Sequence, residues 1–169
     1  MMLRGPLPLS GAPLVTCNFQ ADESPAMSRN DWIERLNAHR SNTLMDTLDI
    51  RYTDGGDDFL IAEMPVDERH RQPMGILHGG ASAALAESVA SAASAMVLSG
   101  TGRAAVGLEL AINHLGAVHA GRIIARADAV HLGRSTHLWQ IRVHDDAGRD
   151  VALAKLTMLV LDDRSPPGS

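Results

Sequence analysis

The stretch QPMGILHGGASAALAESVAS, from Gln72 to Ser91, most constrains the fold of this chain. After a short loop it becomes a run of small and apolar residues that predicts one helix over roughly 79–98. A helix of about 20 residues is about 30 Å long, and it is buried only if a sheet wraps around it. Glu87 stands inside this run. A buried carboxylate is costly unless it has partners or a chemical task.

Strand patterns flank this helix on both sides. A short helix over 31–40, capped by Ser28 or Asn30, precedes two strands that form a hairpin, over 46–54 and 58–66. Four further strands are predicted over about 103–114, 119–131, 135–145 and 150–161. This order predicts an α+β domain in which an antiparallel sheet wraps around one long central helix. The domain spans 29–163, between a loosely ordered extension over 1–28 and a tail over 164–169.

Composition excludes several classes of partner. The net charge of -5 and the lack of a Lys/Arg-rich run argue against nucleic acid. The one cysteine, Cys17, excludes an internal disulfide and is typical of a reducing compartment. His78, Glu87 and several serines make the long helix a poor membrane span, and prolines interrupt the N-terminal apolar stretch that a signal peptide would need. We therefore expect a cytoplasmic protein that does not bind membranes.

Six blocks of the sequence carry a resemblance to a known family: the opening stretch, LDIRY, MPVDERHRQP, VGLELAINH, HLGRSTHLWQI and DDAGRDVALAKLTMLV. Together they resemble the hot-dog acyl-CoA thioesterases of the phenylacetic-acid-degradation thioesterase superfamily. Within it, the chain is most similar to 1,4-dihydroxy-2-naphthoyl-CoA and Arthrobacter-type 4-hydroxybenzoyl-CoA thioesterases. The resemblance covers about residues 31–161. It implies a hot-dog fold, hydrolysis of an aromatic (hydroxyaryl) acyl-CoA to the acid and CoA, and an active site at a subunit interface.

Spacing on the helix also indicates a shared site. Gly79 and Glu87 are eight residues apart, which is about 12 Å on a helix. They cannot both touch one carbonyl group within one chain. Two antiparallel copies of the helix about a two-fold axis would bring the start of one near Glu87 of the other. We therefore expect a homodimer, and the resemblance implies a dimer of dimers.

Thioester chemistry assigns roles to these residues. The N–H of Gly79, at a helix start, would polarise the carbonyl group. Glu87 would act as the nucleophile that forms an anhydride or as the general base toward water, and Ser91, four residues later, would orient that water. Gln72 and His78, matched to the family motif, would position the thioester. The ordinary alternatives are a solvated glutamate, a structural histidine at the helix start, and glycine and serine that merely permit close packing.

The resemblance also implies a binding path for CoA. Its residues are Gly107, His114, Leu115, Gly116, Ala117, His131, Leu132, Gly133, Arg134, Ser135 and Thr136. Arg134 and Ser135 are suited to a phosphate, although HLGRS is equally typical of a tight turn with a surface arginine. The segment after His114 reads LGA, where relatives often carry a basic residue; Arg103 or Arg122 could compensate.

Metal and cofactor sites are not expected. The eight histidines include no compact ligand pair of the H-x-x-x-H kind and no accompanying acidic cluster, and CoA would be part of the substrate. Three alternative functions stay open: a hot-dog hydratase or dehydratase, a proofreading thioesterase acting on acyl-carrier protein, and a non-catalytic acyl-CoA-binding module. The His-Gly-Gly start with Glu87 and Ser91 favours hydrolysis over the first. A binding module has little use for a buried base.

Overall fold

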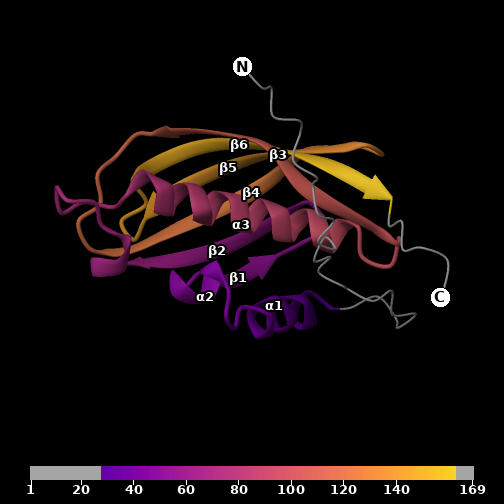
Figure 1. The fold of residues 1–169 in the computed structure, drawn as a ribbon, viewed down its shortest axis with the longest axis horizontal. Coiled ribbons are helices and arrows are strands. Elements are labelled where there is room, and N and C mark those ends of the chain that lie inside the picture. The colour runs from indigo at the N-terminus through magenta and orange to yellow at the C-terminus, as the bar shows by residue number, and fades with distance from the viewer. Residues whose placement is uncertain (1–27, 163–169) are drawn as a thin grey trace, which may run out of the picture.

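A curved six-stranded antiparallel sheet wraps around helix α3 in the computed structural model, which describes residues 28–162 (Figure 1). The strand order is β1-β2-β4-β5-β6-β3, so β1 and β3 form the two edges. The elements are α1 (Arg29–Ala38), α2 (Leu44–Thr47), β1 (Arg51–Gly55), β2 (Phe59–Val66), the 3-10 turn η1 (Glu68–His70), α3 (Gly79–Val97), β3 (Arg103–His114), β4 (Gly121–Leu132), β5 (Thr136–Asp145) and β6 (Asp150–Asp162). The predicted α+β architecture is confirmed. The predicted extension, apart from Ser28, and the predicted tail lie outside the described residues.

The first helix begins earlier than its periodicity predicts. Ser28 rather than Asn30 is the N-cap: its hydroxyl accepts from the Asp31 N–H, and the Asp31 carboxylate accepts from the Ser28 N–H at 3.1 Å. This reciprocal arrangement satisfies two amides that a helix start leaves unpaired. Helix α1 packs beside β1 through the buried Trp32 and Leu36.

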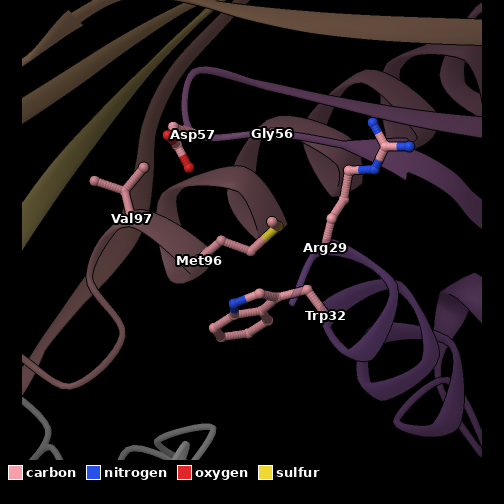
Figure 2. Close-up of a pocket in the computed structure, with 6 residues that line it drawn as sticks. All are labelled: Arg29, Trp32, Gly56, Asp57, Met96 and Val97. Atoms are coloured by element: carbon pink, nitrogen blue, oxygen red, sulfur yellow. The ribbon is translucent and has the colours of Figure 1, made fainter. Parts of the chain in front are cut away.

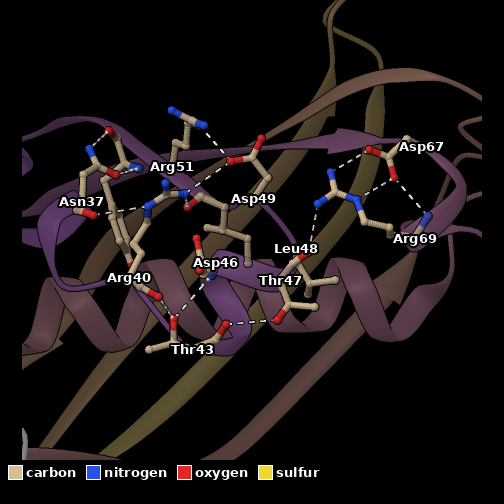
Figure 3. Close-up of polar contacts among 12 residues, drawn as sticks. Asn37, Arg40, Thr43, Asp46, Thr47, Leu48, Asp49, Arg51, Asp67 and Arg69 are labelled. Carbon is tan, nitrogen blue, oxygen red and sulfur yellow. Dashed lines mark hydrogen bonds and ion pairs between the residues drawn. The ribbon is translucent and has the colours of Figure 1, made fainter.

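The strand predicted over 46–54 is wrong in its first half. Leu44–Thr47 form the helical turn α2, and Asp49 adopts a positive φ of 49°, which a strand does not allow. The strand begins at Arg51, and the carbonyl group of Ile50 before it accepts a hydrogen bond of 2.6 Å from Arg40 (Figure 3). Side chains from other segments therefore bind the polar backbone here.

The core lies between α3 and the concave face of the sheet. Small residues dominate the buried face of α3: Ala81, Ser82, Leu85, Ala86, Val89, Ala90, Ala92, Ala93 and Ser94. Their size lets the strands approach the helix closely, and Trp139, Ile141 and Leu156 from β5 and β6 fill the space opposite.

Three polar contacts fix α3 against the sheet. The indole N–H of Trp139 donates to Ser94 Oγ at 2.8 Å, and His137 Nδ1 lies 3.1 Å from the same hydroxyl. The hydroxyl of Tyr52 donates to the carbonyl group of Ser88 at 3.3 Å, and burial raises the pKa of Tyr52 to about 12. The helix is thereby tied to β5 on one side and to β1 on the other.

Replacing Ser94 by alanine should destabilise the fold. The change leaves the buried indole N–H of Trp139 without an acceptor, which costs about 1–3 kcal/mol. Urea unfolding followed by circular dichroism measures the difference. Ser91→Ala is the matched control on the same helix, because its half-buried hydroxyl holds no buried donor. Equal losses in the two variants would contradict the role of Ser94.

Candidate active site

Helix α3 starts with an amide that is open to a ligand. His78 is the N-cap, and its Nδ1 accepts from the Gly80 N–H at 2.8 Å. Within residues 28–162 the Gly79 N–H donates no hydrogen bond. An unpaired amide at a helix N-terminus favours a partial negative charge, such as the oxygen of a polarised carbonyl group.

A hollow of about 370 Å³ lies beside this helix start. It is lined by Gln72, Ile76, Leu77, Gly79, Ser82, His114, Leu115, Gly116, Ala117 and Val151. The ring of His114 covers the Cα of Gly79 so closely that a Cβ there would lie 2.8 Å from His114 Nε2. Only glycine leaves that space free. The structure therefore brings together three predicted parts of the site: Gln72, Gly79 and the segment 114–117.

Glu87 belongs to a second group, farther along α3. Its carboxylate is half-buried and accepts a hydrogen bond of 3.1 Å from Ser91 Oγ. The carboxylate lies directly over Gly107 on β3, and any side chain at that position would collide with it. The exposed-glutamate alternative therefore does not describe Glu87.

These two groups stay apart within one chain. Gly79 and Glu87 are separated by about 12 Å along α3, and the strand residues that face them, His114 and Gly107, are roughly 23 Å apart along β3. Neither Glu87 nor Ser91 lines the hollow beside Gly79. Within one chain the two groups of predicted site residues therefore do not meet.

The segment 131–136 forms a third group, near the Arg103 end of β3. Arg103 donates to the carbonyl group of Arg134, and the Val160 N–H donates to that of Ser135 at 2.9 Å. Arg134 and Ser135 are exposed at the turn between β4 and β5. Within one chain this turn lies on the Glu87 side of β3, away from the segment 114–117.

The two arginines considered as replacements for a missing basic residue do not line the hollow. Arg103 pairs with Asp162 at 3.3 Å, and Arg122 pairs with Glu63 at 2.9 Å. No arginine is among the residues that line the hollow.

Comparisons with known proteins show the family of the chain. Residues 74–152 match the Thioesterase superfamily. The chain is 42% identical over 129 residues to the 1,4-dihydroxy-2-naphthoyl-CoA hydrolase of Escherichia coli, covering 76% of this chain and 94% of that protein. It is also 42% identical over 133 residues to the proofreading thioesterase EntH of Cronobacter turicensis, covering 79% and 96%. A crystal structure of a mutant of thioesterase PA1618 from Pseudomonas aeruginosa matches with a TM-score of 0.74 and 46% identity, covering 76% of this chain and 93% of that one.

The chain belongs to the thioesterase superfamily. It is a thioester hydrolase with the hot-dog fold, so the predicted fold, family and reaction class are confirmed.

A second hollow, of about 360 Å³, shares no lining residue with the hollow beside Gly79. Figure 2 shows the residues around it. It is lined by Arg29, Trp32, Gly56, Asp57, Met96 and Val97. Met96 is nine residues after Glu87, which on a helix is about half a turn away in direction. This hollow therefore faces α1 and the β1–β2 turn, on the side of α3 opposite Glu87.

Other features of the thioesterase bear on cofactors and charge. Burial lowers the pKa of His137, with Arg103 and His131 contributing in the same direction, so a neutral ring faces Ser94. Among the described residues no group of three or more His, Cys, Asp or Glu side chains could hold a metal ion. No helix in the described part of the thioesterase is long and apolar enough to span a membrane.

Sequence reasoning missed some residues that line the hollow of the thioesterase. Ser82 is buried three residues after Gly79 and shares its helix face, so helical spacing could have identified it. Val151 comes from β6 and Ile76 from the loop before α3. No local pattern places either beside Gly79.

Gly107→Ala should lower thioesterase activity by about 10-fold or more, because the new methyl group displaces the Glu87 carboxylate from its position. Thiol release from an acyl-CoA, followed with a thiol-reactive dye, measures the effect. Ala104→Ser, at an exposed position on the same strand, is the control. Wild-type activity in Gly107→Ala would show that this position of the carboxylate is not required.

Proposed function

We propose that this protein is a cytoplasmic thioesterase that hydrolyses an aromatic (hydroxyaryl) acyl-CoA to the acid and CoA. The observation that carries the proposal is the unpaired N–H of Gly79 on the same helix as the Glu87–Ser91 pair. The substrate class is supported by the relative named for 1,4-dihydroxy-2-naphthoyl-CoA, which shares 42% identity with this chain. The single cysteine fits a reducing compartment.

The proposed reaction begins at the thioester carbonyl carbon. Either Glu87 removes a proton from water as the water oxygen attacks, or the carboxylate attacks directly and forms an anhydride that water then hydrolyses. In both routes the carbonyl oxygen becomes an oxyanion that accepts from the Gly79 N–H. The oxyanion then collapses and the carbon–sulfur bond breaks, which in the second route is the step that gives the anhydride. The CoA sulfur leaves with the electron pair and takes up a proton, from Glu87 in the first route and from solvent in the second. Ser91 Oγ donates to Glu87 and holds its carboxylate in place.

A homodimer would complete the site. Strand β3 is a 12-residue sheet edge, and Val106 and Leu108 on it are 45% and 63% exposed. An edge of this length offers its unpaired backbone groups to another strand. We propose that it pairs with the same strand of a second copy, antiparallel about a two-fold axis.

One register of this pairing joins all three groups of the site. If Gly107 lies opposite His114 of the partner subunit, Glu87 over Gly107 comes beside Gly79 of the partner subunit. The same register places the 131–136 turn, at the Arg103 end of β3, near the segment that follows His114 of the partner subunit. The acyl group and CoA would then lie between the two chains. A dimer of dimers stays a prediction of the resemblance.

Proofreading of acyl-carrier protein is the second candidate function, because a relative named proofreading thioesterase EntH is equally similar to this chain. The chemistry at Gly79 and Glu87 would be the same, and only the group that carries the thioester would differ. A hydratase or a binding module has less support, because the confirmed family is one of thioester hydrolases.

Glu87→Gln should lower kcat by about 10²-fold or more, because an amide cannot serve as base or nucleophile. Thiol release is measured for the wild type and the variant on a panel of aromatic and aliphatic acyl-CoAs, with fastest release expected from a hydroxyaryl ester. Glu34→Gln, an exposed glutamate on α1 away from the proposed interface, is the matched control. Unchanged turnover in Glu87→Gln would remove the residue from the mechanism, and release only from an acylated carrier protein would favour the proofreading role.

Mixing two inactive variants tests the shared site. Gln72→Ala and Glu87→Gln remove groups that the proposed dimer brings together from different chains. Unfolding and refolding them together at equal amounts should restore about a quarter of wild-type activity, because half of the dimers are mixed and each carries one intact site. Two Glu87→Gln preparations treated in the same way are the control. No recovery in mixed dimers would show that each chain holds a complete site.

A further inference from the structure

The motif MPVDERHRQP contains a buried histidine that the proposed reaction does not use. His70 closes the turn η1 and is 1% exposed. Its Nε2 lies 2.9 Å from the carbonyl oxygen of Leu48 at the end of α2, and because a carbonyl oxygen only accepts, Nε2 donates. Its Nδ1 lies 3.0 Å from Asp67 Oδ1 and 3.3 Å from the Asp67 N–H. Both ring nitrogens thus have partners: Nε2 contacts Leu48 at the end of α2, and Nδ1 contacts Asp67, the N-cap of η1. His70 therefore lies at the junction between α2 and η1.

The main chain of His70 holds the start of α3. Its carbonyl oxygen accepts from the N–H of His78, the N-cap residue, at 2.7 Å. Just inside this contact, Arg71 and Leu77 form an antiparallel bridge, and the Gln72 N–H donates to Ile76 at 2.8 Å. The loop 71–77 is therefore closed at a neck that begins at His70. This loop carries Gln72, and the next residues lead to Gly79.

Arg69, the residue before His70, also links η1 to the end of α2, but this second link is exposed to water. Arg69 donates to the carbonyl oxygen of Thr47 at 3.1 Å and makes two side-chain hydrogen bonds to Asp67 (Figure 3). These bonds hold the pKa of Asp67 well below its usual range. The side chain of Arg69 is 49% exposed, so water can replace its contacts. Water cannot reach the buried bond between His70 and Leu48 in the same way.

We propose that His70 is a positioning residue for the hydrolysis: its Nε2 bond to Leu48 fixes the neck of the loop that carries Gln72 and sets the place of the Gly79 amide. This inference rests on the proposed function. Loss of the bond lets the two carbonyl-binding groups move together, and a displacement of about 1 Å at a reacting group is enough to lower a rate by orders of magnitude. CoA affinity depends on other residues and stays nearly unchanged.

Three variants separate the contacts of His70. Leucine fills the space without a polar group, glutamine places a donor where Nε2 stands, and asparagine places one only where Nδ1 stands. In thiol-release kinetics, His70→Leu lowers kcat about 10-fold or more with KM within about 2-fold. His70→Gln restores most of kcat and His70→Asn does not. Arg69→Gln is the matched control, because it removes the exposed link between η1 and α2. This variant keeps wild-type kcat.

Amide hydrogen exchange gives a readout that does not depend on activity. Exchange over 71–80 is faster in His70→Leu than in the wild type, whereas exchange over 139–143 in β5 is unchanged. If the wild type releases no thiol from any ester, the proposed function fails, and the exchange data alone decide whether His70 fixes the loop. Unchanged exchange over 71–80 overturns the inference. A lower melting temperature with wild-type kcat overturns it too, because His70 would then only stabilise the fold.

Discussion

Helix α3 lies against the concave face of the sheet, and the small side chains of Ala86, Ala90 and Ala93 are buried in that contact. Because the helix is so thin, strands from both halves of the chain reach it, and the sheet can curve around it. The helix is also held in rotation, by Trp139 on Ser94 and by Tyr52 on the backbone of Ser88. These contacts fix the side of α3 that carries Glu87 relative to the sheet.

The functional groups follow from this placement. Gly79, whose N–H is unpaired within residues 28–162, lines the hollow beside His114, and the carboxylate of Glu87 lies over Gly107 farther along the same edge strand. A rigid helix keeps them about 12 Å apart, which is too far for one carbonyl group. Within one chain the fold thus keeps the two proposed parts of the thioester-cleaving site apart, and this is the physical reason to expect a second copy.

Irregular segments of the protein are fixed by side chains rather than by strand pairing. Between α1 and α3, carbonyl groups of Thr47, Leu48 and Ile50 accept from Arg69, His70 and Arg40, respectively. Charged or buried donors on polar backbone stabilise a loop that has no strand partner of its own. Residues 48–50, between α2 and β1, therefore have a defined position although they are neither helix nor strand.

Local patterns in the sequence determined the long helix and the later strands. They also determined the spacing on that helix, with a glycine at its start and a glutamate eight residues later. Periodicity and residue size are local properties, so the run from Gly79 to Val97 could be predicted without knowledge of its neighbours. The same reasoning failed at residues 46–50. Leu48 and Ile50 alternate as in a strand, but the Thr43 cap, the left-handed Asp49 and the arginine bound to Ile50 decide the backbone there.

Only the tertiary structure decided which predicted site residues meet. It joins Gln72 and Gly79 with the segment 114–117, joins Glu87 with Ser91 and Gly107, and leaves the turn 131–136 at the Arg103 end of β3. It also shows why residues 79 and 107 are glycine, since a methyl group at either would collide with a side chain from another element, His114 or Glu87. These relations depend on strand order and register, which arise from contacts between residues far apart in the chain and leave no mark on the local pattern.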